Sequence, residues 1–378
     1  MAMRDKLLTL ASTPPRRAGG AVIFSDNRVF KRISKQPLWI RTAAGPAIGF
    51  GHVRRSITLG RLLSDVFLPV FLADPWDEWT RAQASAQNWR SVPFDCESLW
   101  KLEPAPAALI IDTRETRGLI QMLAESRRRG IPVISIHDLG LNPLPSDLVV
   151  DGSALPVAYD VPSPQTEFRY GTSYMVLDPS FAAFHNRKKH LRKQVSRVVV
   201  NLGGGDSKEY YPRVLRGLRS WNRNLEVTGI PGFTDWGQSH LRRLDWSPLR
   251  FRWAPRGEPV HSLLFDADIA ITAGGLSAFE AICVGTPLIA VAFDELQQVT
   301  LTALAAANAC FDLGLVASLE PEKLAESLTA LERDFSLRRR LSESGRQVVD
   351  GRGAERVAAL IRRLVHDRSD QTVGMALR

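Results

Sequence analysis

The stretch of sequence that decides the fold is Asp268-Ile-Ala-Ile-Thr-Ala-Gly-Gly-Leu-Ser-Ala-Phe-Glu-Ala-Ile-Cys-Val-Gly-Thr-Pro287. An apolar run over residues 269–271 ends at Gly274-Gly275, and apolar residues then recur at helical spacing until Gly285. This order predicts a strand, a glycine turn and a helix. The first N–H groups of a helix lack partners and lie at the positive end of its dipole. The turn is therefore suited to bind an anion such as a nucleotide phosphate.

Glu280 lies one turn into this predicted helix. Its carboxylate can accept hydrogen bonds from the two adjacent hydroxyls of a ribose. Glycine turns between strands and helices also occur in α/β domains that bind no nucleotide. The nucleotide interpretation therefore depends on two further glycine turns in the chain.

One of these turns runs from Gly45 to Gly51 and is followed by a helical apolar face over residues 57–63. It differs from a dinucleotide-binding fingerprint, because Arg54 stands where the third glycine would allow close packing of the helix on the strand. We therefore reject an NAD-dependent dehydrogenase. The other turn, Gly203-Gly204-Gly205, follows an apolar run over residues 198–202. Three consecutive glycines indicate backbone that is left-handed or closely approached by another group.

His52 follows Gly51 at the start of a predicted helix. A helix N-terminus disfavours the imidazolium form, so this histidine is a candidate general base. The alternative is a structural histidine. Arg55, one turn further on, is a candidate contact for a diphosphate, with an ordinary surface cation as the alternative.

The composition is that of a globular protein: 378 residues, of which 44% are hydrophobic and 24% charged. This length predicts two domains. No apolar run approaches the roughly 20 residues of a membrane span. The three cysteines are scattered at Cys96, Cys283 and Cys310, which fits neither a disulfide framework nor a metal cluster. We expect a cytoplasmic protein without a bound metal.

The formal net charge of +9 is the main compositional bias. The sequence has no nucleic-acid module in which aromatic and basic residues alternate. We interpret the basic runs at residues 187–193 and 338–340 as solvated faces, with attraction to an anionic membrane surface as the alternative.

Strands and helices alternate in two successive series. Apolar runs typical of buried parallel strands lie at residues 38–40, 69–72, 108–111, 132–136, 148–150, 195–202, 269–271 and 288–292, and two further strands are predicted near 226–228 and 250–253. Helices are predicted between them, for example over 119–129, 211–221 and 298–307. The pattern predicts two doubly wound α/β domains that face a cleft, at residues 37–185 and 186–368. Residues 1–36 are expected to be a poorly ordered extension and 369–378 a tail.

Several motifs occur together in an order that resembles one family. They are Gly49-Phe-Gly51-His52-Val-x-Arg55, Leu202-Gly203-Gly204-Gly205-Asp206, Ala273-Gly274-Gly275-x-Ser277-x-x-Glu280, Gly285-x-Pro287 and Gln297. With these motifs the chain resembles the UDP-sugar hydrolase of pseudaminic acid biosynthesis and the related spore-coat polysaccharide proteins. It resembles more distantly the glycosyltransferase that completes the lipid-linked peptidoglycan precursor.

The resemblance implies a GT-B fold and a nucleotide-sugar substrate, with neither metal nor cofactor. It implies that His52 assists a water or an acceptor hydroxyl, and that Glu280 binds the ribose. The diphosphate and sugar contacts that it implies, together with those expected from the glycine turns, are Gly49, Gly51, Arg55, Gly203, Gly204, Gly274, Gly275, Ser277 and Gln297.

Two positions depart from the family pattern. Where the hydrolase commonly has Asp-x-Tyr at the end of a strand, this chain has Asp112-Thr113-Arg114, and Glu295-Leu296-Gln297 replaces Asp-Asn-Gln. We place Asp112 and Arg114 on the substrate side of the site. The expected function is cleavage of a nucleotide sugar at its anomeric carbon with water as acceptor. The alternatives are transfer to a glycan or lipid-linked hydroxyl, and nucleotide-sugar binding without catalysis.

Overall fold

A computed structural model describes residues 35–376, with gaps at 47, 96, 116, 138–143, 156–164, 205–209, 222–223, 233–246, 248 and 256. The side chains of residues 369 and 371–376 are also outside the description. Most of the predicted N-terminal extension lies outside the described residues, as do Gly205 and Asp206 of the second glycine turn.

The first half is a seven-stranded parallel sheet in the order β3-β2-β1-β4-β5-β6-β7. Its strands are β1 (Pro37–Thr42), β2 (Leu68–Ala73), β3 (Arg90–Pro93), β4 (Ala108–Asp112), β5 (Val133–His137), β6 (Leu148–Asp151) and β7 (Glu167–Tyr170). The helices between them are α1 (Gly51–Leu63), α2 (Glu78–Ser85) and α3 (Leu119–Arg128), with a 3-10 turn, η1, at Leu99–Lys101. Side chains alternate across β1: Leu38 and Ile40 pack with α1, whereas Trp39 packs with α3.

The second half is a six-stranded parallel sheet in the order β10-β9-β8-β11-β12-β13. Its strands are β8 (Arg197–Asn201), β9 (Glu226–Gly229), β10 (Arg250–Trp253), β11 (Ile269–Ala273), β12 (Leu288–Ala292) and β13 (Phe311–Leu315). Its helices are α5 (Tyr211–Trp221), α7 (Val260–Asp266), α8 (Leu276–Cys283), α9 (Glu295–Ala306), α10 (Pro321–Arg333) and α11 (Phe335–Val348), with η3 at Val316–Ser318. Val198 and Val200 of β8 pack with α5 and α10, and Val199 packs with α7 and α8.

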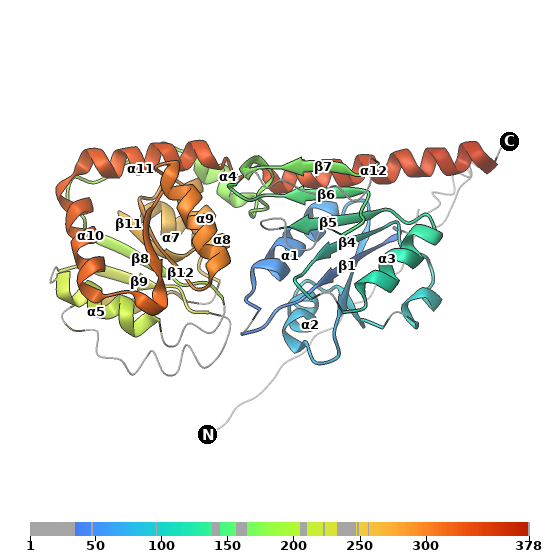
Figure 1. Ribbon diagram of the computed structural model, residues 1–378, viewed down its shortest axis with the longest axis horizontal. Coiled ribbons are helices and arrows are strands. Elements are labelled where there is room, and N and C mark those ends of the chain that lie inside the picture. Colours follow the sequence, from blue (N-terminus) through green and yellow to red (C-terminus); the bar gives the residue numbers. More distant parts are fainter. Residues whose placement is uncertain are drawn as a thin grey trace, which may run out of the picture. The chain divides into compact units, whose positions relative to one another are not determined.

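Both sheets have the doubly wound order that was predicted, and in both the order reverses beside the first strand (Figure 1). In the first half β1 pairs with β2 on one side and β4 on the other. In the second half β8 lies between β9 and β11. Ligands of open α/β sheets bind beyond the carboxyl ends of the strands at such reversals. The carboxyl ends of β1, β4, β8 and β11 are therefore where a site is expected.

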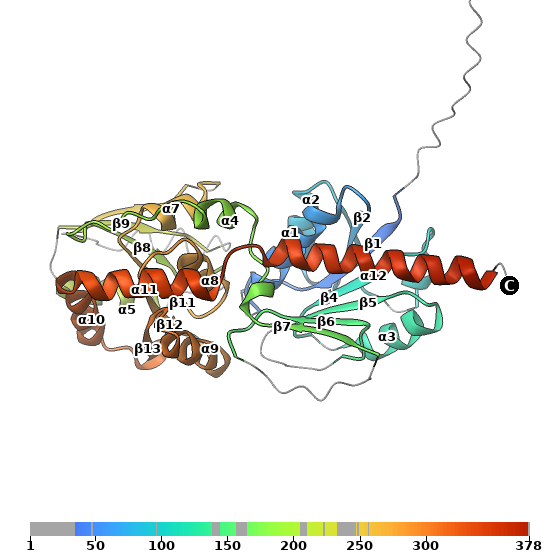
Figure 2. The ribbon, with the colours of Figure 1, turned by 90° about the horizontal axis from the view of Figure 1, so that it is seen from above.

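The last helix, α12 (Gly353–Ala376), packs on the first half although it follows the second half in the chain (Figures 1 and 2). Val357 and Ile361 of α12 belong to the buried cluster that contains Leu38 and Ile40 of β1. This differs from the predicted boundary, which placed residues 186–368 together. Apolar spacing in a sequence shows that a helix buries one face, but it does not show which sheet that face meets.

The chain crosses between the halves at two adjacent segments. The first contains η2 (Thr172–Tyr174) and α4 (Ser180–His185), and the second joins α11 to α12. At Gly353 a Cβ would lie 2.1 Å from the carbonyl oxygen of Met175 and 2.7 Å from its carbonyl carbon. Both neighbours are backbone atoms, which cannot move aside as a side chain can. The two segments therefore lie too close together for a side chain at residue 353.

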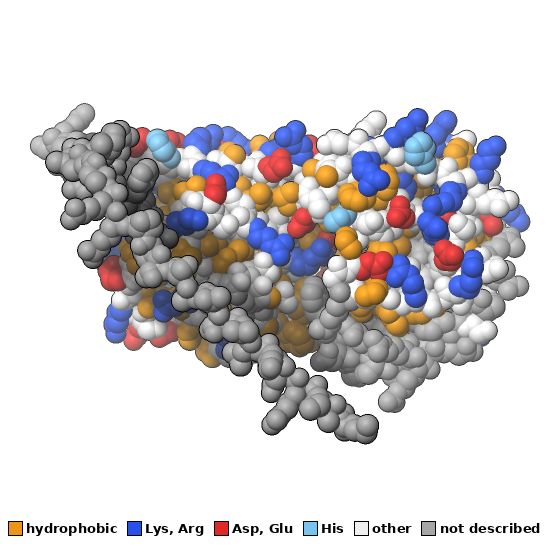
Figure 3. All heavy atoms as spheres, turned by 180° about the vertical axis from the view of Figure 1, so that it is seen from behind, with side chains coloured by type: hydrophobic (Ala, Val, Ile, Leu, Met, Phe, Trp, Pro, Cys, Tyr) orange, Lys and Arg blue, Asp and Glu red, His pale blue; other side chains and the backbone are white. Residues whose placement is uncertain are grey.

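Most residues of the two basic runs are exposed, as the interpretation of solvated faces requires, but one cation of each run is withdrawn from solvent. Lys189 donates hydrogen bonds to the carbonyl of Ala267 at 2.8 Å and the hydroxyl of Thr286 at 3.2 Å, and burial lowers its pKa to about 7. Arg338 is 1% exposed and donates to the carbonyls of Arg192 and Lys193. On the face shown in Figure 3, basic side chains are spread over the surface with acidic side chains between them.

We predict that Ile361→Ala lowers the free energy of unfolding by about 2–5 kcal/mol, because a buried isoleucine that becomes alanine leaves a cavity. Ile361 is fully buried, whereas Ile120 is 78% exposed. Ile120→Ala is therefore the matched control and is expected to change little. Urea unfolding followed by tryptophan fluorescence measures both. Equal stability of the two variants would contradict the packing of α12 on the first half.

Candidate active site

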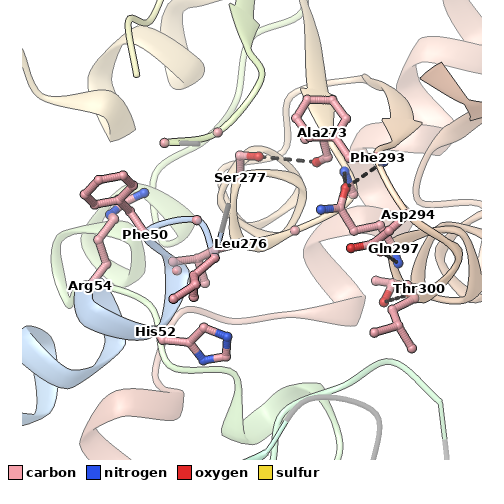
Figure 4. A pocket seen from close by; sticks show the side chains of 18 of the residues that line it. Phe50, His52, Arg54, Ala273, Leu276, Ser277, Phe293, Asp294, Gln297 and Thr300 are labelled. Atoms are coloured by element: carbon pink, nitrogen blue, oxygen red, sulfur yellow. Dashed lines mark hydrogen bonds between the residues drawn. The ribbon is translucent and has the colours of Figure 1, made fainter. Parts of the chain in front are cut away.

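A cavity of about 390 Å³ lies at the carboxyl ends of the strands where both sheets reverse, and residues of both halves line it. Most of the residues that the sequence assigned to substrate or catalysis are on its wall. These are Gly49, Gly51, His52, Arg55, Arg114, Gly203, Gly204, Gly274, Gly275, Ser277 and Gln297. Asp112 and Glu280 are the assigned residues that do not line it. Figure 4 shows His52 from α1 together with Ser277 and Gln297 from the second half around this pocket.

His52 is held by a buried carboxylate. It is the second residue of α1, and its Nδ1 lies 2.7 Å from Oδ1 of Asp112, the last residue of β4. Arg55, one turn along α1, donates from Nε to Oδ2 of Asp112 at 2.9 Å and from Nη2 to Oδ1 at 2.7 Å. Strand β1 pairs with β4, so the helix after β1 starts beside the end of β4.

The charge state of Asp112 decides which ring nitrogen of His52 carries a proton. Burial opposes ionisation of Asp112, but the charge of Arg55 and the hydrogen bonds from His52 and Arg55 lower its pKa below the ordinary value. An ionised carboxylate accepts hydrogen bonds and donates none. The proton of the contact with Asp112 therefore lies on Nδ1 of His52, and Nη2 of Arg55 is a second close neighbour of this nitrogen at 2.9 Å. In the neutral ring with this tautomer Nε2 has the lone pair, and the pocket-lining histidine can act as a general base.

Asp112 does not line the pocket but contacts residues that do. The sequence predicts a substrate contact at this position, and this prediction is wrong, because Asp112 is fully buried and its two oxygens are bonded to His52 and Arg55. The same bonds hold Arg55, which is 5% exposed. Position at the end of a strand was correctly inferred from the sequence. The sequence did not show that the buried arginine would take both oxygens of this carboxylate.

The glycine turn before α8 has the arrangement that the sequence predicted. Gly275 precedes α8, and no side chain caps the start of this helix. A Cβ at Gly275 would meet no atom within 4 Å, whereas at Gly274 it would lie 2.9 Å from the Leu301 side chain. Gly274 therefore permits the close approach of α9, and Gly275 leaves open space at the helix N-terminus.

Gln297 fixes the same turn from α9. Its Oε1 accepts hydrogen bonds from the N–H of Gly274 at 3.2 Å and of Phe293 at 3.1 Å (Figure 4). The oxygen is thereby committed to backbone, which leaves the Nε2 amino group as the donor that a ligand could meet. Ser277 donates to the carbonyl of Ala273 at 3.3 Å.

Two ion pairs join the halves beside the pocket. Arg54 of α1 pairs with Glu280 of α8, and Arg114 after β4 pairs with Asp294 before α9 at 3.8 Å. The side chains of Arg114 and Asp294 are 43% and 45% exposed, so this second pair is largely solvated. Burial raises the pKa of Glu280, and the charge of Arg54 acts against that rise.

Several residues of the second half that were not predicted from the sequence also line the pocket. Tyr210 and Phe293 line the pocket with their rings 4.5 Å apart, and Asp294 lines it beside them. Asp294 caps α9 by accepting from the N–H of Gln297 at 2.8 Å. The spacing Asp294-x-x-Gln297 is that of a helix capping box, and it could have placed both residues at the helix start beside β12. No comparable signal pointed to Tyr210.

Within the part of the chain that the structure describes, no group of three or more His, Cys, Asp or Glu side chains is arranged to hold a metal ion. The helices described there include none that is both long and apolar enough to cross a membrane.

The fold defines the class of protein, which is the GT-B class. The chain superimposes on MurG of Acinetobacter baumannii with a TM-score of 0.63 and 16% identity, covering 87% of this chain and 99% of MurG. A UDP co-structure of S. aureus MnaA gives a TM-score of 0.57 and 11% identity, over 88% of this chain and 97% of MnaA. At these identities the likeness concerns the fold. The predicted GT-B architecture is confirmed.

A curated relative has a closer sequence match. Over 201 residues the chain is 30% identical to the spore coat polysaccharide biosynthesis protein SpsG of Bacillus subtilis (strain 168). The match covers 53% of this chain and 59% of SpsG, so the chain spans less than two thirds of that relative's length. No protein-family model matches the chain. The resemblance to the spore-coat polysaccharide proteins is confirmed over this region.

We predict that Asp112→Ala lowers the free energy of unfolding by about 3–5 kcal/mol, because removal of one partner leaves the buried charge of Arg55 unpaired. Asp65→Ala is the matched control, since Asp65 is 65% exposed where it pairs with Arg362. Exposed ion pairs contribute little to stability. A loss of stability in Asp112→Ala no larger than in the control would show that Asp112 does not hold the cluster.

The contribution of Asp112 to the free energy of unfolding is expected to decrease at low pH. Folding lowers the pKa of Asp112, so the ionised carboxylate stabilises the folded protein at pH values above the ordinary pKa of an aspartate. This stabilisation is lost as the pH falls below roughly 4. The stability difference between wild type and Asp112→Asn should therefore narrow from pH 6 to pH 3.5. A difference that stays constant over this interval would contradict the lowered pKa.

Proposed function

We propose that this protein cleaves a nucleotide-activated sugar, with a UDP-sugar as substrate and water as acceptor, in the biosynthesis of a surface polysaccharide. The bond that breaks joins the anomeric carbon to the diphosphate oxygen. The place in polysaccharide biosynthesis is supported by the match to SpsG, and the uridine nucleotide by the UDP bound in the co-structure of MnaA.

The observation that carries the proposal is His52 held through Nδ1 by Asp112 on the wall of a pocket whose other side is the glycine turn before α8. Nε2 of His52 removes a proton from water while the water oxygen attacks the anomeric carbon. The carbon–oxygen bond breaks, and the nucleoside diphosphate leaves with the bonding electrons. The imidazolium that forms is stabilised by the carboxylate of Asp112.

The leaving diphosphate is expected at the start of α8. Backbone N–H groups at an uncapped helix start, together with the helix dipole, stabilise the charge that develops on it. The Nε2 amino group of Gln297 can donate a further hydrogen bond. A single displacement of this kind inverts the configuration at the anomeric carbon.

The alternative is transfer of the sugar to a hydroxyl of a glycan or lipid-linked acceptor. It uses the same base, because a histidine can take a proton from either nucleophile. Incubation with a panel of UDP-sugars, with and without acceptors, separates the two when UDP and free sugar are followed independently. Inverted free sugar without acceptor supports hydrolysis, and UDP release only with an acceptor supports transfer. Tight nucleotide binding without turnover would support a binding protein.

We predict that His52→Asn reduces kcat by about 100-fold to 10,000-fold and leaves the affinity for UDP nearly unchanged, because a general base acts mainly in the transition state. His366→Asn carries the same substitution at a histidine whose side chain is 74% exposed, and it should behave as wild type. The measurements are UDP release and calorimetric titration with UDP. Activity above half of wild type in His52→Asn would refute the role of His52.

Arg114 stands where the resembling hydrolases have a tyrosine, and it lines the pocket. A guanidinium neither donates nor takes a proton at neutral pH, but it binds carboxylates and phosphates. We predict that Arg114→Tyr changes which sugars are accepted more than it changes the affinity for UDP. The exposed Arg117, which does not line the pocket, provides the control Arg117→Tyr. Identical substrate profiles for wild type and Arg114→Tyr would remove Arg114 from sugar selection.

A further inference from the structure

Arg54 and Glu280 form an ion pair between the two halves at the edge of the pocket. Arg54 is two residues after His52 on α1, and Glu280 is on α8, which follows the glycine turn. The two side chains differ in exposure: that of Arg54 is 34% exposed and that of Glu280 is 1% exposed. Arg54 lines the pocket, whereas Glu280 does not.

The carboxylate of Glu280 is incompletely bonded. Its Oε1 accepts from Nη2 of Arg54, and its Oε2 is buried without a hydrogen-bond partner among the described residues. A buried polar atom without a partner is unfavourable. Burial of the carboxylate and the nearby charge of Asp178 both disfavour ionisation, and Arg54 counteracts them. The site thus has a buried carboxylate oxygen to which a ligand hydroxyl could donate a hydrogen bond. The partly exposed Arg54, which bonds to the other oxygen of this carboxylate, lines the pocket.

A ribose and a guanidinium compete for such a carboxylate. Two adjacent hydroxyls can donate to both oxygens of Glu280, whereas Arg54 bonds to Oε1. A released guanidinium keeps its charge and its donors, and a diphosphate is a strong acceptor for it. The pocket that Arg54 lines also contains the glycine turn where the diphosphate is expected.

We propose that Arg54 occupies the carboxylate of Glu280 in the ligand-free protein, and that the ribose of a bound nucleotide replaces it while the guanidinium turns to the diphosphate. This inference rests on the proposed nucleotide-sugar function. Arg54 is then a positioning residue that changes partner on binding. Nucleotide binding by the second half is thereby linked to the helix that carries His52 in the first half.

The exchange predicts opposite effects on two ligands. Uridine has the ribose but no phosphate, so it must displace Arg54 without offering it a new partner. UDP displaces Arg54 and also binds it. Arg54→Met removes the competitor for the ribose and the cation for the diphosphate in one substitution.

Calorimetric titration of wild type and Arg54→Met at pH 8 tests the exchange. We expect the Kd for uridine to fall by about tenfold and the Kd for UDP to rise by about tenfold, which is the size of effect that one charged hydrogen bond produces. Arg117→Met, at an exposed arginine that does not line the pocket, should leave both values unchanged. If Arg54→Met is unstable, Arg54→Gln should give the same two directions with smaller changes.

Other outcomes overturn the inference. A rise in both Kd values would mean that Arg54 only supports the shape of the site, and unchanged values would mean that it contacts neither Glu280 nor the ligand in solution. Failure of wild type to bind uridine and UDP at all is a different result. It would contradict the proposed function itself, and the exchange with it.

Discussion

The buried carboxylate of Asp112 is the group around which the site is built. It lies at the end of β4 with no exposed surface, and it is bonded to His52 and to Arg55 from α1. Burial at such a depth opposes ionisation of the carboxylate, and the charge of Arg55 together with the hydrogen bonds from His52 and Arg55 lowers its pKa. An ionised Asp112 favours the His52 tautomer with its proton on Nδ1. The position of a base thus follows from the pairing of β1 with β4 and from one arginine a helical turn away.

The second half contributes mainly backbone. The uncapped start of α8, the glycines before it and the amide of Gln297 form a surface suited to an anion, and none of these groups carries a full charge. The arginines that line the pocket come from the first half and are paired with Asp112, Glu280 and Asp294. A bound anion therefore meets neutral donors and cations that are already partly neutralised. An anion that binds in the pocket can therefore replace the carboxylate partner of one of these arginines.

Local features were readable from the sequence because they depend on neighbouring residues. The apolar runs and the alternation of elements located ten strands, and the glycines and His52, which were predicted to form a site, line one pocket at the strand ends. Short strands such as β3 (Arg90–Pro93) and β7 (Glu167–Tyr170) were missed because they contain polar residues and lie at sheet edges. Contacts between residues that are far apart in the sequence could not be predicted either. The packing of α12 on the first sheet and the contact of Arg54 with Glu280, 226 positions away, have no local signal.

The central claim is that the bond to the anomeric carbon breaks when a nucleophile activated by His52 attacks that carbon. Turnover of a UDP-sugar in ¹⁸O-labelled water, with mass spectrometry of both products, tests it most directly. Attack of water at the anomeric carbon places one ¹⁸O atom in the released sugar and none in UDP. Label in the terminal phosphate of UDP would place the attack at phosphorus and would contradict the assignment of the pocket.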